Sequence, residues 1–353
     1  MSLPSVLSPF GQCRRTALRT FAGVVAGAAV FWTGAAAAQT PLRFTLDWRF
    51  EGPAAPFLVA IDKGYFKDEG LDVTIDTGNG SREAIPRVAS GTYDMGFGDI
   101  NSLVRFRDEN PNVDVKAVMM VYDRPPFSII GRKSRGISSD PKSLEGKTFG
   151  APVADGAFAQ WPIFKQVNGL DDSRMKFENV GFPVREPMLA SGEVDAIFGF
   201  AMSSLINLKS RGVAVDDIVV MLMGDYGVEL YGNAIMVSAK FAAEKPEAVK
   251  GFLRAFVRGL KDTVANPSAA VDSVIKRNDV AKKEVELERL QMNLAQNVIT
   301  PWVKENGFGG IDAARFEKAL EQIGLTFTFK NKPVAGDIFV DTYLPPHAER
   351  MID

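Results

Sequence analysis

The chain has 353 residues, a length typical of two domains or of one large two-lobed unit. Hydrophobic residues make up 46% and charged residues 24%, and 41 Lys and Arg nearly balance 43 Asp and Glu, which argues against a disordered chain and against a nucleic-acid partner. One cysteine, Cys13, and one histidine, His347, nearly exclude chemistry that depends on either residue type.

The N-terminal segment has the composition of an export signal. Three arginines and no acidic residue precede an uncharged stretch, residues 21–38, that ends in four alanines. This order predicts a signal peptide over residues 1–38, cleaved near Ala38, and a periplasmic location. Arg14-Arg15 resembles a twin-arginine signal. The alternatives are a general secretory signal and a retained membrane anchor, since the uncharged stretch approaches the roughly 20 residues that span a bilayer.

The single cysteine lies inside this segment. The mature chain would therefore contain no cysteine and no disulfide, although the compartment would permit one. Its stability must come from a hydrophobic core.

The mature chain alternates strand and helix patterns. Apolar and polar residues alternate at 42–46 and 71–75, and a helical face that includes Phe57 lies between these two expected strands. After them, apolar runs bounded by Gly, Pro or Asp predict further strands at 115–122, 127–131, 148–151, 196–200 and 218–223. This order predicts an α/β protein whose sheets are mainly parallel and flanked by helices.

The C-terminal third has a different texture. After a strand-like segment at 233–237, residues 240–325 are nearly all helical in pattern, with an apolar stripe formed by Val249, Phe252, Leu253, Phe256, Val257 and Leu260. We expect this helical block to pack on the first lobe and to close it.

Two segments form an internal repeat. Residues 82–99 and 183–200 align without gaps, and each copy has the pattern of a short helix, a Gly stop and a buried strand that ends in Gly. Chance similarity of two helix–turn–strand units is the alternative. The repeat predicts two lobes of similar α/β build.

The lobes follow from the repeat and from the two expected chain crossings. We predict lobe 1 from residues 39–131 and 231–353, and lobe 2 from residues 132–230. The crossings near 130–132 and 231–233 would together form a hinge.

Facing lobes of this kind form a cleft, because ligands of open α/β sheets bind beyond the carboxyl ends of the strands. We expect an aromatic or apolar sandwich with a few polar groups, suited to a small ring or a planar acid. The residues predicted to bind the ligand are Trp48, Phe50, Ser81, Arg82, Asp99, Asn101, Asp155, Gly156, Phe182, Arg185, Phe200 and Tyr226.

Each of these residues has a plainer structural interpretation. Trp48 would stack on a ligand or plug the core, and Asp99 would accept from an amine or ring N–H or only order its loop. Ser81 and Asp155 stand at expected helix starts, which suit either an anion or a simple N-cap. Arg185 is the charge best able to pair with an anion in two-pronged fashion, and a solvated arginine is the alternative.

Several segments resemble the solute-binding proteins of ABC importers for nitrate, sulfonates, taurine and thiamine-type pyrimidines. The resemblance follows the family's order and is carried by Leu46-Asp47-Trp48, residues 64–73, 89–99, Leu144-Glu145-Gly146-Lys147, residues 190–195 and Tyr343-Leu344-Pro345. It implies the type II periplasmic-binding-protein fold, a "Venus-flytrap" that closes on a small solute and delivers it to an ABC permease in the inner membrane. We expect such a protein to act as a monomer without a cofactor.

The segment after Trp48 departs from the pyrimidine-binding branch that Leu46-Asp47-Trp48 resembles most. That branch usually carries Asn and His shortly after the Trp, and this chain has Arg49-Phe50-Glu51-Gly52-Pro53 instead. Pyrimidine-like solutes and small organic acids or sulfonates therefore both stay open as ligands.

The alternative function is a pyrimidine-biosynthesis enzyme on the same scaffold, of a group that uses its own histidine as substrate. His347 lies far from the Trp48 loop in sequence, in a tail that begins with Pro345-Pro346. The sequence contains no Walker A pattern, no Gly-x-Ser-x-Gly elbow and no His or Cys cluster for a metal. We therefore predict a binding protein and not an enzyme, with no catalytic residue, cofactor or metal.

Overall fold

The computed structural model describes residues 38–352. The predicted signal peptide therefore lies, except for Ala38, outside the described residues. Within residues 38–352, none of the helices combines the length and the hydropathy needed to cross a bilayer.

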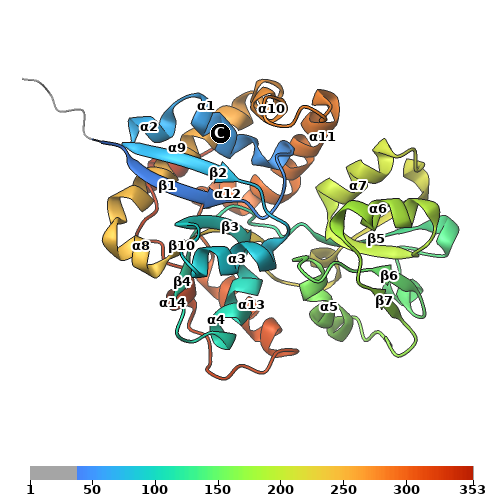
Figure 1. The fold of residues 1–353 in the computed structure, drawn as a ribbon. Coiled ribbons are helices and arrows are strands. Elements are labelled where there is room, and N and C mark those ends of the chain that lie inside the picture. The colour runs from blue at the N-terminus through green and yellow to red at the C-terminus, as the bar shows by residue number, and fades with distance from the viewer. Residues whose placement is uncertain (1–37, 353) are drawn as a thin grey trace, which may run out of the picture. The chain divides into compact units, whose positions relative to one another are not determined.

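The first sheet has five strands in the order β2-β1-β3-β10-β4 (Figure 1). β1 pairs in parallel with β2 and β3, whereas β10 is antiparallel to both β3 and β4, so four of the five strands run in one direction. The strands are β1 (Thr40–Thr45), β2 (Leu71–Asp76), β3 (Met95–Asp99), β4 (Val115–Met120) and β10 (Asn233–Ser238).

The second sheet repeats this arrangement in the order β7-β6-β8-β5-β9. β6 is parallel to β7 and β8, and β5 is antiparallel to β8 and β9. The strands are β5 (Phe127–Arg132), β6 (Thr148–Gly150), β7 (Lys176–Glu178), β8 (Ala196–Phe200) and β9 (Ile218–Leu222). The predicted α/β fold with mainly parallel sheets is confirmed. The one reversed strand in each sheet is the first strand after the chain arrives from the other sheet.

Helices flank both sheets. Those that follow strands of the second sheet are α5 (Trp161–Val167), α6 (Phe182–Ser191) and α7 (Ala201–Ser210). The others are α1 (Ala55–Asp62), α2 (Tyr65–Asp68), α3 (Ser81–Ala89), α4 (Ile100–Glu109), α8 (Ala239–Glu244), α9 (Pro246–Ala265), α10 (Pro267–Ile275), α11 (Lys283–Asn293), α12 (Pro301–Asn306), α13 (Ala313–Gly324), α14 (Ala335–Ile338) and α15 (His347–Arg350).

The predicted helical block lies against the first sheet, as expected. Its longest helix, α9, buries the whole apolar stripe and packs against α1 and α2. Phe252 of α9 stacks on Phe44 of β1 with ring centroids 4.8 Å apart. The block therefore shares its core with the first sheet, so it cannot act as an independent domain.

The sequence repeat corresponds to equivalent structural elements. Its first copy forms α3 and β3, its second forms α6 and β8, and β3 and β8 each occupy the central position of their sheet. Gly91 and Gly192, which follow these two helices, have φ values of +74° and +82°. Only glycine adopts this left-handed conformation at low cost, which explains why both copies carry Gly there.

The chain passes between the sheets at residues 121–126 and 227–232. The first passage was predicted at 130–132, but residues 127–131, assigned to the first lobe from the sequence, pair with β8 and β9 in the second sheet. An apolar run shows that a segment is buried and does not show which sheet buries it. Pro125-Pro126 directly precede β5 and separate it from β4.

Candidate functional site

A pocket lies beyond the carboxyl ends of β1 and β8 and is lined by residues that come from segments of both sheets. Seven of the predicted residues line it: Trp48, Ser81, Asp155, Gly156, Phe182, Arg185 and Phe200. The position agrees with the rule that open α/β sheets bind ligands at their carboxyl edges. The structure brings these seven side chains and backbone segments together, and their role in binding stays a prediction.

Two aromatic side chains face each other in the pocket. Trp48, from the loop after β1, meets Phe182, at the start of α6, edge to face with ring centroids 4.8 Å apart. The cavity beside them has a volume of about 50 Å³, room for only a few water molecules. A ligand with an aromatic ring must therefore separate Trp48 from Phe182 or move one of them.

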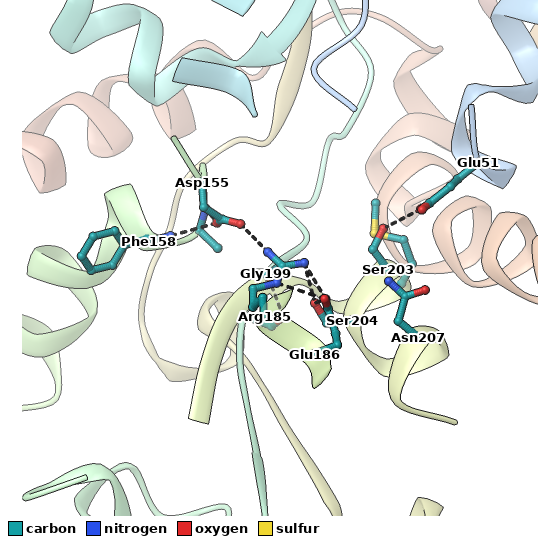
Figure 2. Close-up of polar contacts among 12 residues, drawn as sticks. Glu51, Asp155, Phe158, Arg185, Glu186, Gly199, Ser203, Ser204 and Asn207 are labelled. Atoms are coloured by element: carbon teal, nitrogen blue, oxygen red, sulfur yellow. Dashed lines mark hydrogen bonds and ion pairs between the residues drawn. The ribbon is translucent and has the colours of Figure 1, made fainter. Parts of the chain in front are cut away.

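Arg185 lies at the centre of a buried ion cluster (Figure 2). Its Nη1 donates to Asp155 Oδ2 at 2.7 Å, and its Nε and Nη2 donate to Glu186 Oε1 at 3.0 and 2.6 Å. Nη2 also donates to Ser204 Oγ at 3.1 Å. Because these bonds leave no free pair of N–H groups, Arg185 is neither available for two-pronged pairing with an anion nor solvated, in contrast to both sequence interpretations.

The two carboxyl groups of this cluster differ. Burial raises the pKa of Asp155, despite the opposing attraction of Arg185. Burial alone would raise the pKa of Glu186 as well, but the positive charge and the hydrogen bonds of Arg185 outweigh this effect. The pKa of Glu186 therefore lies below its usual range. Asp155 Oδ1 accepts from the amides of Ala157 and Phe158, so Asp155 orders the turn before the next helix, although Ala157 and not Asp155 occupies the N-cap position.

Asp47 is a buried carboxyl group in the pocket that the sequence analysis did not select. Its Oδ2 accepts from Ser81 Oγ at 2.9 Å and from Asn233 Nδ2 at 2.6 Å. Among residues 38–352 no cation lies within ion-pair distance of Asp47. Burial therefore raises its pKa to about 7, although both hydrogen bonds act in the opposite direction. Ser81 serves as a donor to Asp47 and not as an N-cap, since Gly80 occupies the N-cap position.

Glu51 is the second unselected acid of the pocket. Its Oε2 lies 3.3 Å from Arg289 Nη1 on α11. The same oxygen accepts from Ser203 Oγ at 3.3 Å, a contact drawn in Figure 2. Arg289 is shared with Glu286, whose Oε2 accepts from Arg289 Nε at 3.0 Å. Burial raises the pKa of Glu51, and the nearby charge of Glu286 adds to this against the attraction of Arg289.

Buried acids outnumber buried bases around the pocket. Among the described residues, five buried carboxyl groups line the pocket or contact a residue that does: Asp47, Glu51, Asp155, Glu186 and Glu286. The buried guanidinium groups there, in the same part of the chain, are two, those of Arg185 and Arg289. Arg49 also lines the pocket but is exposed and lies over the Trp48 ring. In addition, Trp48 Nε1 is buried and has no acceptor at hydrogen-bond geometry within the described residues, although its N–H lies near enough to the Glu51 carboxyl to favour the ionised form of that group. The site suits a ligand that donates N–H groups and offers one acceptor.

Five predicted residues lie outside the pocket lining. Phe50 packs against the first core, and Arg82 donates to Val153 O at 3.1 Å. The Tyr226 hydroxyl donates to Ser139 O and its ring packs on Phe164. None of these three side chains contributes to the pocket lining: Phe50 and Tyr226 pack on neighbouring segments, and Arg82 is exposed.

Asp99 and Asn101 complete this group. Asp99 is fully buried and is the N-cap of α4, accepting from the amides of Asn101 and Ser102. The Asn101 side chain donates to Tyr231 O at 2.7 Å. The loop-ordering interpretation of Asp99 is thus the one that agrees with the structure.

The residues that sequence reasoning missed include Asp47, Glu51, Tyr122 and Ser203. Asp47 follows a strand end directly, which is a usable signal. Glu51, Tyr122 and Ser203 reach the pocket from three separate segments, so that only their tertiary placement reveals them.

Replacing Asp47 by Asn should alter the pH dependence of stability. In the wild type, the pKa of Asp47 is higher in the folded state than the value near 3.8 of the unfolded chain. The stabilisation linked to this difference is fully present below about pH 3.8 and is lost as the pH rises through about 7. Across that range the free energy of unfolding should fall by roughly 4 kcal/mol in the wild type, and D47N should lack this fall. Denaturant unfolding at several pH values measures it, with the exposed Asp279→Asn as control. A D47N slope equal to that of the wild type would contradict the assignment.

The two mixed five-stranded sheets, each with a reversed strand beside its central strand, define the fold of periplasmic binding proteins. The alkanesulfonate-binding protein SsuA from Xanthomonas axonopodis pv. citri bound to MOPS is similar, with a TM-score of 0.66 at 13% identity over 88% of this chain and 99% of that one. The aliphatic sulphonate-binding protein SsuA from Escherichia coli gives a TM-score of 0.64 at 12% identity over 83% and 94%.

Residues 53–270 match the family model described as NMT1/THI5 like, and the chain belongs to this family. The riboflavin-binding protein RibY from Chloroflexus aurantiacus is 30% identical over 62% of this chain, and the match spans only 61% of RibY. A formylaminopyrimidine-binding protein from Halalkalibacterium halodurans is 29% identical over 83% of this chain and 88% of that protein. A 4-amino-5-hydroxymethyl-2-methylpyrimidine phosphate synthase from Aspergillus parasiticus is 24% identical over 76% and 81%.

Proposed function

We propose that this protein is the solute-binding component of an ABC importer and captures a small planar heteroaromatic compound that carries N–H donors. The observation that carries the proposal is the pocket itself, in which Trp48 and Phe182 stand beside the buried carboxyl groups of Asp47 and Glu51. In this proposal the chain is exported, works in the periplasm as a monomer and docks on a permease in the inner membrane.

The charge of the site favours a pyrimidine-like ligand over a sulfonate or nitrate. Arg185 is occupied by Asp155 and Glu186, so an anion would find no free pair of guanidinium N–H groups there and would lie beside the carboxyl groups of Asp47 and Glu51. A ring that carries an amino group and a ring nitrogen can donate to a carboxylate and accept from the orphan Trp48 Nε1. The names of the riboflavin- and formylaminopyrimidine-binding relatives support this class of ligand.

Capture by closure is supported by the lining of the pocket. Ser81 belongs to α3 beside the first sheet, whereas Phe182 and Ser203 belong to α6 and α7 beside the second. We propose that the two sheets with their helices act as lobes that turn about the two passages at 121–126 and 227–232. A ligand that contacts both lobes would bind the closed arrangement more tightly than the open one and would thereby stabilise the closed arrangement.

An enzyme of the pyrimidine-synthase type is the alternative that the fungal relatives raise. The single histidine of the chain, His347, lies in α15 and is not among the residues that line the pocket. This placement favours binding without turnover.

The test is a thermal-unfolding screen of the purified mature chain. Aminopyrimidines and flavins should raise the unfolding temperature, and alkanesulfonates and nitrate should not. The compounds recovered after incubation should be chemically unchanged. Stabilisation by sulfonates alone would reject the proposed ligand class, and consumption of an added compound would reject the binding role.

Replacing Trp48 by Ala should weaken binding of the best aminopyrimidine or flavin by about 10- to 100-fold, because stacking and burial of one aromatic face contribute roughly 1.5–3 kcal/mol. Trp48 is half-buried, so the unfolding temperature of the free protein should change little. Isothermal titration calorimetry measures the affinity. Trp302→Ala, another half-buried tryptophan that does not line the pocket, is the matched control and should keep wild-type affinity.

A further inference from the structure

A second cavity of about 580 Å³ lies between α3 and α4 on one side and the segment that leads into α5 on the other. Figure 1 shows the three helices that supply most of its walls. It shares no lining residue with the pocket of Trp48 and Phe182. Its walls include Arg82, Ser102, Arg105, Phe158, Trp161 and Phe327.

Two arginines of this cavity lack ionic partners. Within residues 38–352, neither Arg82 nor Arg105 lies within 4.0 Å of a carboxylate oxygen. Arg82 Nη1 donates to the carbonyl oxygen of Val153 at 3.1 Å, and Arg105 Nη2 donates to Gln160 Oε1 at 3.1 Å. Both acceptors are neutral, so two positive charges face one cavity without neutralisation.

Arg105 is the more constrained of the two. Its Nη1 is buried and has no acceptor within the described part of the chain. Burial lowers the pKa of Arg105, and the positive charge of Arg82 adds to this against the attraction of Asp99 and Glu109. An unpaired, partly desolvated guanidinium is costly, and an anion would offset that cost.

The nearby acids do not neutralise the site directly. Asp99 is not part of the cavity wall, and Gln160 stands between it and Arg105, because Gln160 Nε2 donates to Asp99 Oδ2 at 3.0 Å. Glu109 does line the cavity, but it is exposed at the end of α4, where water screens its charge. The guanidinium of Arg105 therefore has no carboxylate in contact with it among residues 38–352.

The remaining wall is aromatic. Phe158 and Trp161 belong to the second core and pack on Phe198 and Phe177, and Phe327 contributes from the segment after α13. Trp161 Nε1 is buried without an acceptor among residues 38–352. Aromatic rings beside arginines suit a compound that combines a ring with a negatively charged group.

We propose that this cavity is a second binding site for an aromatic anion, whose carboxylate or phosphate group lies between Arg82 and Arg105 and whose ring packs on Phe158 and Trp161. The site has the opposite charge preference to the pocket of Asp47 and Glu51. It does not rest on the proposed function, since its ligand and its residues are different.

The test is calorimetric titration of the full mature chain with phenyl phosphate at constant ionic strength, with benzyl alcohol as the uncharged ring. The wild type should bind phenyl phosphate saturably and more tightly than benzyl alcohol. Arg105→Gln and Arg82→Gln should each weaken binding by about 10-fold or more, since each removes one charge-assisted hydrogen bond. Arg211→Gln removes the same charge from an exposed arginine outside the cavity and should bind like the wild type.

Arg82 is exposed, so the Arg82→Gln variant should fold normally and can test the site even if the Arg105→Gln variant folds poorly. A crystal structure of the complex should place the phosphate between Arg82 and Arg105. Wild-type affinity in both cavity variants, equal affinity for benzyl alcohol, or a phosphate located between Trp48 and Phe182 would each overturn the proposal.

Discussion

Replacing Arg185 by Met should lower the free energy of unfolding by roughly 3–5 kcal/mol, the range measured when one member of a buried ion pair is removed. Arg185 is 2% exposed and bonds to Asp155, Glu186 and Ser204. Met fills a similar volume, so the effect arises mainly from two carboxyl groups that stay buried without their cation. Urea denaturation at neutral pH measures the change.

The carboxyl groups supply the control. The triple variant Arg185→Met, Asp155→Asn, Glu186→Gln removes the buried charges together and should recover part of the loss, because neutral amides cost less to bury than carboxylates. Arg211→Met at an exposed position should have little effect. A loss below about 1 kcal/mol in the single variant would show that water or a rearrangement compensates for Arg185.

Replacing Gly259 by Ala should destabilise the protein by roughly 1–3 kcal/mol, although Ala favours helices by about 1 kcal/mol over Gly. Gly259 lies in α9 where this helix packs on α1. A Cβ atom there would stand 2.3 Å from the carbonyl oxygen of Pro56 and 3.0 Å from Ala60 Cβ. A backbone oxygen cannot turn aside, so α1 and α9 must separate.

The displacement should also reach the ligand pocket, because Phe57 of α1 lines it and packs on Phe256 of α9 with ring centroids 4.3 Å apart. We therefore expect weaker ligand binding together with the lower stability. Gly336→Ala in α14 is the matched control, since a Cβ there meets no atom within 4 Å. It should be neutral or slightly stabilising, and a Gly259→Ala protein as stable as the wild type would contradict the close packing of α1 on α9.

The elements of the fold could be predicted because their signals are local. The alternation at 42–46 and 71–75 and the stripe of α9 correspond to β1, β2 and α9. The repeat identified α3-β3 and α6-β8 as equivalent units. The sheet to which β5 belongs could not be predicted, since pairing joins residues far apart in the chain and leaves no periodic signal.

The site was predicted in part for a similar reason. Trp48, Ser81, Phe182 and Phe200 line the pocket because residues after strand ends meet at the carboxyl edge of a sheet. Asp99 follows a strand end as well, but its carboxylate caps α4. A strand end fixes where the backbone is, whereas hydrogen bonds to neighbouring segments decide where the side chain points.

The sequence by itself determined the α/β class, the repeat, the helical block and the neighbourhood of the pocket, because periodicity and strand ends are properties of consecutive residues. Only the tertiary structure decided the charge of the pocket. Arg185 carries the charge that an anionic ligand would need, yet Asp155, 30 residues away, and Glu186 have taken up its N–H groups. Asp47, which has no cation within ion-pair distance among residues 38–352, and Glu51, which shares Arg289 with Glu286, line the pocket as well, and only long-range contacts set these pairings.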